Sequence, residues 1–270
     1  MNTHEPGYVP HTYWVVENDT AEPTDGGVIE ESLITIYVNG QELATLMCSP
    51  LDQEALALGF LYNEGVIDSL NEVGHLQANK ARTVIDVLLT RQAFEAPRRM
   101  ILTTGCGGGV TFQHLAEQHP SLETDFVTTS QIIFDRMRDL QGAARLYQAV
   151  RGVHTAILGD EHQMLVSAED VGRHNAVDKI AGKALSAGIE TRDRIMLTSG
   201  RVSSEMLGKA RRMEIPVVAS RTAPTSIAVQ LAQTWNICVI GYVRRGSMRV
   251  YTHPQRLGLR ELVDEGLSRL

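Results

Sequence analysis

The fold is decided by residues 194–243, which read RIMLTSGRVSSEMLGKARRMEIPVVASRTAPTSIAVQLAQTWNICVIGYV. Short apolar runs typical of strands alternate in this stretch with runs of helical spacing. The expected strands are 194–198, 217–219 and 237–243, and the expected helices are 203–213 and 225–233. Strands separated by helices of this length predict an α/β fold, in which a mostly parallel sheet is the middle of a three-layer sandwich.

The pattern continues on both sides of this stretch. We expect helical pieces at 130–150 and 175–187 and strands at 153–158, 164–167 and 249–251. Before residue 130 the order changes, because Asn39-Gly40 predicts a hairpin between strands at 32–38 and 42–48. A helix at 52–64 and a strand at 84–90 follow. The expected organisation is a tail or edge arm at 1–31, an α+β domain at 32–129 and an α/β domain at 130–270.

Composition excludes several classes of protein. The chain has 270 residues, of which 43% are hydrophobic, and a net charge of −7. No Lys/Arg-rich block is present, so we expect no general binding to nucleic acid. No apolar run has the length of a membrane span, and the first residues are polar, unlike a signal peptide. We therefore expect no membrane association and a cytoplasmic location.

The three cysteines have different surroundings. Cys48 and Cys238 lie in apolar strand patterns, where a free cysteine is usually a small buried residue. Cys106 is followed by three glycines, which leave its thiol sterically open and allow backbone N–H groups to stabilise a thiolate. This pattern is typical of a nucleophile, and the alternative is a glycine loop with an incidental cysteine. Three widely spaced cysteines exclude a disulfide framework and a zinc cage of paired CxxC units.

Polar clusters follow several of the expected strands. Residues 169–175 read EDVGRHN and lead to Lys179, while SGRVSS at 199–204 and SRTAPTS at 220–226 precede helices. Hydroxyl groups, glycine and arginine before a helix favour binding of phosphate or pyrophosphate. The alternative is ordinary helix capping with solvated charges. A fourth cluster, GYVRRG at 241–246, supplies an aromatic ring and two guanidinium groups, unless it is simply the surface of a hairpin.

Taken together, these segments resemble the FdhD/NarQ family, the formate dehydrogenase accessory sulfurtransferases. The resemblance rests on EDVGRHNAVDK at 169–179, SGRVSSEM at 199–206, APTS at 223–226 and GYVRRG at 241–246. It implies a C-terminal domain similar to cytidine deaminases and a homodimer. It also implies a carrier that accepts sulfur from a cysteine desulfurase as a persulfide and serves formate dehydrogenase. The acceptor would be the molybdenum bis(molybdopterin guanine dinucleotide) cofactor, bound as a substrate.

The resemblance places the persulfide on Cys106. Many members of the family have CxxC at this loop, but this chain has Gly109 in place of the second cysteine, which puts a two-thiol mechanism in doubt. The residues expected to bind the cofactor are His174, Ser199, Gly200, Arg201, Tyr242, Val243, Arg244, Arg245, Gly246 and Ser247. The sequence does not indicate which of Glu169, Asp170, His174 and Lys179 contacts the cofactor.

Two other functions remain open. A chaperone that only binds the cofactor would leave Cys106 incidental. A zinc nucleotide deaminase needs HxE and a later PCxxC, but His174 is followed by Asn175-Ala176 and no PCxxC occurs. We therefore expect no bound metal. The chain also has no GxxxxGK[ST], GxGxxG, HExxH or GxSxG motif, which makes ATPases, nicotinamide dehydrogenases, zincins and serine hydrolases poor fits.

Overall fold

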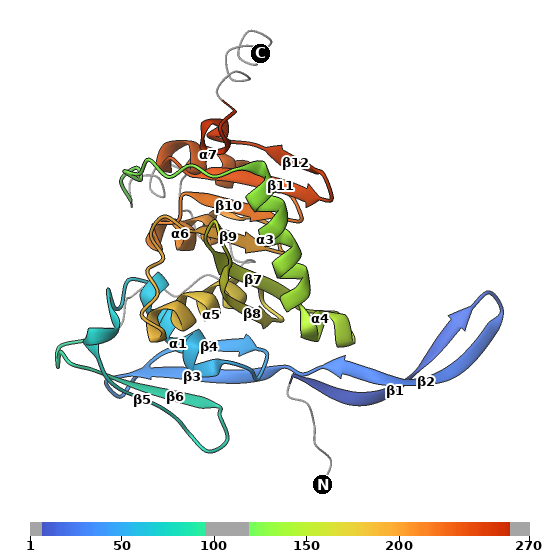
Figure 1. Cartoon of the computed structure of the whole chain (residues 1–270). Helices are drawn as coiled ribbons and strands as arrows, with labels where there is room; N and C mark the ends of the chain where they lie inside the picture. Colours follow the sequence, from blue (N-terminus) through green and yellow to red (C-terminus); the bar gives the residue numbers. More distant parts are fainter. Residues whose placement is uncertain (1–6, 95–118, 260–270) are drawn as a thin grey trace.

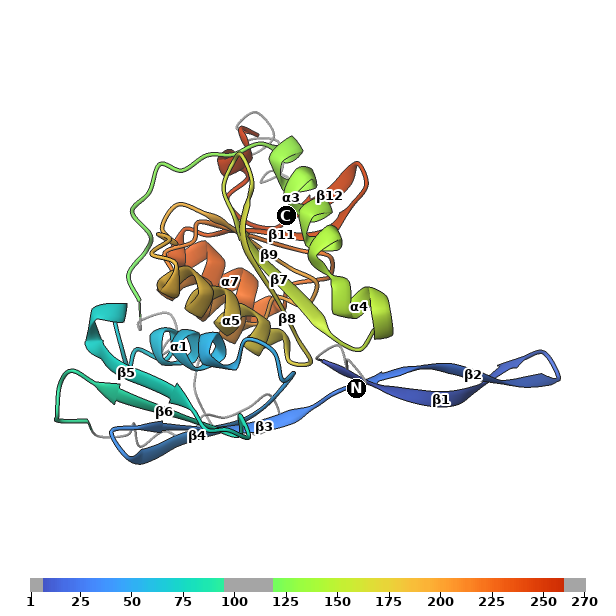
Figure 2. The same cartoon turned by 60° about the horizontal axis from the view of Figure 1, so that its bottom comes forward.

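A computed structural model describes residues 7–94 and 119–259 of the chain (Figure 1). The described part of the chain begins with a long antiparallel ribbon made of β1 (Tyr8–Glu17) and β2 (Thr20–Ile29). This ribbon, called the arm below, projects from the body beside the short helix α4, as two views show (Figures 1 and 2). The segment expected to be a tail or edge arm is thus a regular hairpin over most of its length.

The next elements form a four-stranded sheet with one helix on it. The strands are β3 (Ser32–Val38), β4 (Gln41–Cys48), β5 (Val73–Ala78) and β6 (Val84–Leu89), in the order β4-β3-β6-β5. The turn between β3 and β4 is the expected one, because Asn39 and Gly40 both have positive φ angles (49° and 78°), which Asn-Gly tolerates. Helix α1 (Gln53–Asn63) covers the inner face, where Leu56 and Phe60 pack with Ile36, Ile85 and Val87. Between α1 and β5 lies a short turn of 3-10 helix, η1 (Leu70–Glu72).

The second sheet has six strands in the order β12-β11-β10-β9-β7-β8. Their bounds are β7 (His154–Gly159), β8 (Met164–Asp170), β9 (Ile195–Thr198), β10 (Val217–Ser220), β11 (Cys238–Arg244) and β12 (Ser247–Val250). The pairing pattern makes β8, β9, β10 and β11 run in one direction and β7 and β12 in the other. The α/β class is confirmed, and most strands do run the same way. The pairings are more mixed than expected, since only β9 with β10 and β10 with β11 are parallel.

Helices cover both faces of this sheet (Figure 2). One face is covered by α3 (Ser130–Ala143) and α4 (Arg145–Val150), and the other by α5 (Arg173–Ser186), α6 (Ser204–Arg212) and α7 (Ser226–Trp235). Each strand contributes side chains to both helical layers, because successive side chains point to opposite faces of the sheet. In β10, Val218 packs with α5, α6 and α7, whereas Val217 and Ala219 pack with α3. A second turn of 3-10 helix, η2 (Pro254–Leu257), follows β12.

The two sheets are joined through α1 and α5, whose backbones approach closely. A Cβ atom on Gly59 of α1 would overlap the carbonyl oxygen of Asp178 and lie 2.7 Å from the amide nitrogen of Gly182. A Cβ atom on Gly182 of α5 would overlap the carbonyl oxygen of Ala55. Glycine is therefore required on both helices. The side chain of Tyr62 packs against the cores on both sides, so the boundary expected near residue 130 stays a prediction.

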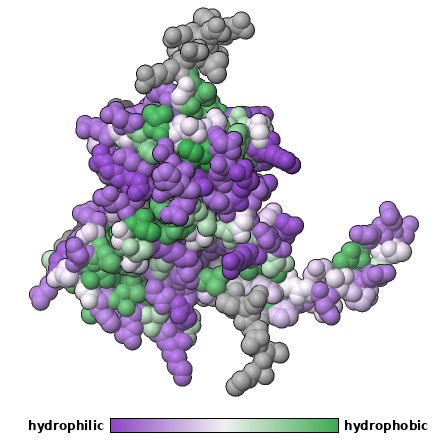
Figure 3. Space-filling view, in the orientation of Figure 1, coloured by the Kyte–Doolittle hydropathy of each residue, from purple (hydrophilic) through white to green (hydrophobic). Residues whose placement is uncertain are grey.

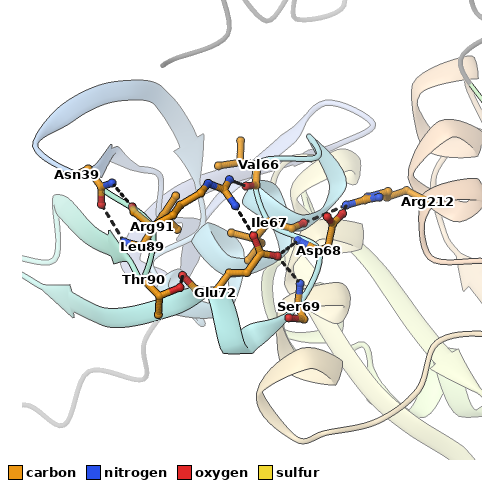
Figure 4. Close-up of polar contacts among 10 residues, drawn as sticks. All are labelled: Asn39, Val66, Ile67, Asp68, Ser69, Glu72, Leu89, Thr90, Arg91 and Arg212. Atoms are coloured by element: carbon orange, nitrogen blue, oxygen red, sulfur yellow. Dashed lines mark hydrogen bonds and ion pairs between the residues drawn. The ribbon is translucent and has the colours of Figure 1, made fainter. Parts of the chain in front are cut away.

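The chain is held firmly where it leaves β6 (Figure 4). Asn39 accepts a hydrogen bond from the amide of Leu89 (2.8 Å) and donates one to the carbonyl oxygen of Arg91 (3.0 Å). The guanidinium of Arg91 donates to the carbonyl oxygen of Val66 and pairs with Glu72. These contacts fix the end of the four-stranded sheet just before residue 95.

The chain is held equally well after residue 118. Arg211 of α6 donates a hydrogen bond to the carbonyl oxygen of Pro120 (2.8 Å). The amide of Leu122 donates to the carbonyl oxygen of Trp235 (3.0 Å). Next along α6, Arg212 pairs with Asp68 and donates to the carbonyl oxygen of Ile67 (3.0 Å), both of which precede β5 (Figure 4). The described residues on either side of 95–118 therefore belong to one packed body.

Candidate functional site

The polar clusters that follow the strands meet at one edge of the six-stranded sheet. Strands β9, β10 and β11 end at this edge, and β7, which runs in the opposite direction, begins there. Between this edge and helices α3 and α4 lies an open cavity of about 510 Å³, called the edge cavity below. It is lined by Leu140, Gln141, Ala144, Tyr147, Gln148, Arg151, Val153, His154, Thr155, Ser199, Arg221, Thr222 and Arg244.

The walls of the edge cavity are tied together by short polar contacts. Ser199 Oγ accepts a hydrogen bond from the amide of Thr155 (3.0 Å), and its own amide donates to the carbonyl oxygen of Thr155 (2.9 Å). Arg244 Nη1 donates a hydrogen bond to the carbonyl oxygen of Arg221 (2.5 Å). The amide of Arg221 donates to the carbonyl oxygen of Thr198 (3.2 Å). Each loop at the edge is therefore fixed by its neighbour.

The lining of the edge cavity is positively charged. Arg151, Arg221 and Arg244 contribute to it, and within residues 7–94 and 119–259 no Asp or Glu lines it. Burial and the nearby Arg173 lower the pKa of His154, which keeps that imidazole neutral at neutral pH. Guanidinium groups bind phosphate oxygens through paired hydrogen bonds, so this lining suits an anionic ligand.

Helix α4 forms the outer wall of the edge cavity and owes its position to Glu169. The carboxylate of Glu169, near the end of β8, accepts hydrogen bonds from the amides of Leu146 (2.8 Å) and Tyr147 (2.9 Å) at the start of α4. A carboxylate at a helix start satisfies amides that have no partner within the helix. Glu169 therefore positions the wall that carries Tyr147 and Arg151.

Only two of the expected cofactor residues, Ser199 and Arg244, line the edge cavity. Val243 is fully buried in the core that faces α3, so its side chain supports β11. Tyr242 is exposed, and the guanidinium of Arg249 lies 4.3 Å from its ring centre. Of the expected residues, Arg245 and Gly246 form the turn to β12, and Ser247 is the first residue of β12. Their contacts with a ligand stay predictions.

His174 lies in the first turn of α5, away from the edge cavity. Its Nε2 atom is 3.2 Å from Ser203 Oγ, and its Nδ1 atom is 3.5 Å from Glu205 Oε2. Burial, followed by the charge of Lys209, lowers the pKa of His174 to about 3. The imidazole is therefore neutral, and the polar groups around it form a second cluster on the α5–α6 side of the sheet.

Gly200 lies between this second cluster and the edge cavity. A Cβ atom at Gly200 would lie 2.9 Å from Cβ of Arg173 and 3.3 Å from Nδ1 of His154. The next residue, Arg201, is exposed, and its charge contributes to lowering the pKa of Arg173. The sequence therefore brings Gly200 and Arg201 to the sheet edge as expected, although neither lines the edge cavity.

Asp170 and Lys179 form a buried joint between the two sheets. Their charged groups are 2.6 Å apart and completely buried. Asp170 also accepts hydrogen bonds from the amides of Ser49 (3.0 Å) and Gly172 (2.8 Å), and Lys179 donates to the carbonyl oxygen of Ser49 (3.2 Å). Ser49 directly follows β4 and Gly172 directly precedes α5, so the ion pair holds the end of β4 against the start of α5.

Sequence reasoning missed Tyr147, Arg151 and His154 as lining residues. Tyr147 and Arg151 lie in and just after a helix that carries no motif, and they reach the edge cavity only because Glu169 holds that helix there. His154 begins β7, and its place at the edge depends on the reversed direction of that strand. The sequence does contain a signal for His154, because a histidine that begins an otherwise apolar strand lies at the edge of the sheet.

The described cysteines are both buried and free. Burial raises the pKa of Cys48 to about 11 and that of Cys238 to about 12. Their placement in apolar strands confirms the interpretation that they belong to the core. Cys106 and Gly109 lie outside the described residues.

The described residues also bear on the expectations about metal binding and membrane association. Within residues 7–94 and 119–259, no group of three or more His, Cys, Asp or Glu side chains is arranged to hold a metal ion. The expectation that the chain binds no zinc stays a prediction. No helix in the same part of the chain is both long enough and apolar enough to cross a membrane.

Comparisons with known proteins identify relatives over nearly the whole chain. The model of the FdhD/NarQ family matches residues 29–258. The chain is 36% identical to the sulfur carrier protein FdhD of Staphylococcus aureus (strain MRSA252), over 85% of this chain and 88% of that protein. It is 33% identical to the protein of the same name in Bacillus subtilis (strain 168), over 90% and 95%.

A solved structure agrees with these matches. A chain described as a formate dehydrogenase accessory protein, from Desulfotalea psychrophila, superposes with a TM-score of 0.78 at 25% sequence identity. The match covers 93% of this chain and 100% of that one. The family resemblance based on four short motifs is confirmed, and the chain belongs to the FdhD/NarQ family.

Proposed function

We propose that this chain is a sulfur carrier that serves the maturation of a formate dehydrogenase. In this proposal Cys106 accepts sulfur from a cysteine desulfurase as a persulfide, and the edge cavity binds the molybdenum bis(molybdopterin guanine dinucleotide) cofactor that receives it. The names of the relatives support the sulfur carrier role. The observation that carries the cofactor part is a cavity that the described part of the chain lines with three arginines and no carboxylate.

The edge cavity suits one nucleotide end of this substrate. Its volume of about 510 Å³ is within the range of small-molecule sites. Arg151, Arg221 and Arg244 supply guanidinium groups for a pyrophosphate, and the exposed ring of Tyr147 offers a surface on which a base can stack. In this proposal the outlying residues Tyr242 and Arg245 contact parts of the substrate that extend beyond the cavity.

The loading step needs only a thiolate on this chain. The Cys106 thiolate attacks the outer sulfur of the desulfurase persulfide, and the S–S bond of that persulfide breaks. The cysteine of the desulfurase leaves as a thiolate, and Cys106 now carries the outer sulfur with its proton. No net oxidation or reduction occurs. Since Gly109 replaces a second cysteine, the proposal uses one thiol of this chain.

Cys106 alone is expected to gain sulfur when the protein is incubated with a cysteine desulfurase and cysteine. At pH 8 only about a thousandth of the Cys48 thiols are ionised, given a pKa of about 11, and Cys238 is less ionised still. Peptide mass analysis should place one extra sulfur atom on Cys106. Sulfur mainly on Cys48 or Cys238 contradicts the assignment. Full maturation of formate dehydrogenase by Cys106→Ala would favour the chaperone that only binds the cofactor.

Replacing Arg244 by Ala should weaken binding of GDP more than binding of guanosine. The substitution removes a phosphate partner from the edge cavity, and a hydrogen bond to a charged group contributes about 1.5 to 3 kcal/mol. The expected loss for GDP is therefore roughly 10- to 150-fold, measured by calorimetric titration at low salt. Arg138→Ala is the matched control, because Arg138 lies on α3 outside the edge cavity with 68% of its side chain exposed.

The control and the two ligands separate the possible outcomes. Equal losses for GDP and guanosine would assign Arg244 to the base or to the fold. If Arg138→Ala weakens GDP binding as much as Arg244→Ala does, the loss reflects the overall surface charge and not a phosphate contact of Arg244. If the wild-type chain does not bind GDP at low salt, the cofactor part of the proposal fails while the persulfide part stands on its own test.

A further inference from the structure

Arg151, which directly follows α4, has an unusual backbone conformation. Its φ and ψ angles are 62° and −159°, a combination that essentially only glycine adopts freely. Asp52, Asn236 and His253 also have positive φ angles, but they lie in the ordinary left-handed region. The turn after α4 is therefore strained at a residue that lines the edge cavity.

Contacts on both sides of Arg151 impose this conformation. Glu169 fixes the start of α4, and the amide of Arg151 donates a hydrogen bond to the carbonyl oxygen of Tyr147 (2.9 Å). Val150 lies against Gly27 at the root of the arm, whereas the rest of the arm stands clear of the body (Figure 3). After Arg151 the chain enters β7 within three residues. A strained conformation persists only where its surroundings fix it in this way.

The side chain of Arg151 lies over the ring of Tyr147, one turn earlier in α4. Its guanidinium carbon is 4.9 Å from the ring centre, which is within the range of a cation–π contact. Within residues 7–94 and 119–259 this guanidinium has no hydrogen bond or ion pair. Glycine would form the same turn without strain, so what the arginine adds is a charged group that covers an aromatic surface of the edge cavity.

The contact between Arg151 and Tyr147 is weak compared with the contact that a phosphate offers. An exposed cation–π contact favours the paired state by roughly two- to fivefold. A hydrogen bond between a guanidinium and a charged oxygen contributes roughly 10- to 150-fold. A phosphate that enters the edge cavity should therefore draw Arg151 away from the ring. The same movement uncovers a face of Tyr147 on which a base can stack.

We propose that Arg151 covers the ring of Tyr147 in the free protein and leaves it only when the phosphate of a nucleotide binds the guanidinium. The edge cavity then selects ligands that carry a base and a phosphate together. A nucleoside must displace Arg151 without offering it a phosphate, and free pyrophosphate uncovers the ring without supplying a base. This inference rests on the proposed binding of the guanine dinucleotide cofactor in the edge cavity, and it adds how that cavity discriminates against nucleosides.

Calorimetric titration of the full chain with GDP and with guanosine tests the proposal. Arg151→Ala should weaken GDP binding by about tenfold, because a phosphate partner is lost. The same variant should tighten guanosine binding by roughly two- to fivefold, because the ring is already uncovered. Arg221→Ala is the comparison within the cavity, since Arg221 lines it but does not stack on Tyr147. That variant should weaken GDP binding and should not tighten guanosine binding.

Opposite changes for the two ligands distinguish the proposal from a structural role of Arg151, because damage to the cavity weakens both. Adding Tyr147→Leu to Arg151→Ala should remove the gain for guanosine. Guanosine binding that falls or stays unchanged in Arg151→Ala overturns the inference, while the proposed function stands if Arg244→Ala weakens GDP binding as expected. If the wild-type chain binds no GDP, the cofactor part of the proposed function fails and this inference fails with it.

Urea unfolding tests the strained backbone without any ligand. Arg151→Gly should be more stable than Arg151→Ala, by up to about thirtyfold in the folding equilibrium constant, because glycine alone adopts this conformation freely. At Gly142 of α3, where a Cβ atom would meet no atom within 4 Å, the usual order should hold and Gly142→Ala should stabilise the chain. If Arg151→Gly is less stable than Arg151→Ala, the backbone does not hold the guanidinium over the ring and the proposal is overturned.

Discussion

Replacing Gly59 by alanine should destabilise the protein by more than about 4 kcal/mol, a loss that is exceptional for a single substitution. The added Cβ atom would overlap the carbonyl oxygen of Asp178 on α5, and this obstacle is backbone that cannot rotate away. Helices α1 and α5 must then move apart, which opens the packing between the two sheets. Urea unfolding followed by circular dichroism measures the loss.

Gly208→Ala is the matched control for this prediction. Gly208 lies within α6, and a Cβ atom there would meet no atom within 4 Å. Because alanine has a higher helix propensity than glycine, this variant should be more stable than wild type by up to about 1 kcal/mol. If Gly59→Ala and Gly208→Ala have similar stability, the close approach of α1 and α5 is not a feature of the folded protein.

Replacing Lys179 by methionine should cost about 3 to 5 kcal/mol of folding free energy, the usual loss when one member of a buried ion pair is removed. Methionine has a similar length but leaves the carboxylate of Asp170 buried without its cation. It also removes the hydrogen bond to the carbonyl oxygen of Ser49, so the joint between β4 and α5 is weakened. The same unfolding experiment measures the effect.

Lys183 provides a control one helical turn further along α5. Its ion pair with Asp52 has the same length, 2.6 Å, but both side chains are about one-third exposed. Exposed pairs contribute little, so Lys183→Met should cost at most about 1 kcal/mol. Equal losses in the two variants would show that burial does not determine the effect. Adding Asp170→Asn to Lys179→Met should restore part of the stability, since no unpaired charge remains.

The sequence predicted the elements whose signals are local. Each strand and helix expected within 194–243 is present, because an apolar period and a capping residue suffice to define it. Thr225, for example, accepts a hydrogen bond from the amide of Ala228 at the start of α7. The arm was not predicted as a hairpin, since β2 contains Pro23, Gly26 and Gly27 and has no apolar alternation. Its pairing depends on β1 rather than on its own composition.

The site was predicted only in outline, because its walls come from distant parts of the chain. The edge of the sheet and Arg244 were expected from the order of strands and clusters. Val243 was included for its place in a motif. It faces the same core as Ile240 because β11 is irregular between them, with a register shift between Gly241 and Arg244 and a positive φ (51°) at Tyr242, and simple alternation does not predict this. Asp170 looked like a site residue from sequence, but its partner Ser49 lies 121 residues earlier, a relation that no local pattern contains.

The contact between α1 and α5 also means that α1 is synthesised well before the helix that covers it. Gly59 and Gly182 meet in the folded protein but are 123 residues apart in the chain. At a translation rate of about 5 to 20 residues per second, α1 leaves the ribosome roughly 6 to 25 seconds before its partner helix is made. During that interval the surface of α1 that will face α5 is uncovered on the nascent chain. A chaperone that binds exposed apolar surface therefore has several seconds in which it can bind α1 before α5 covers it.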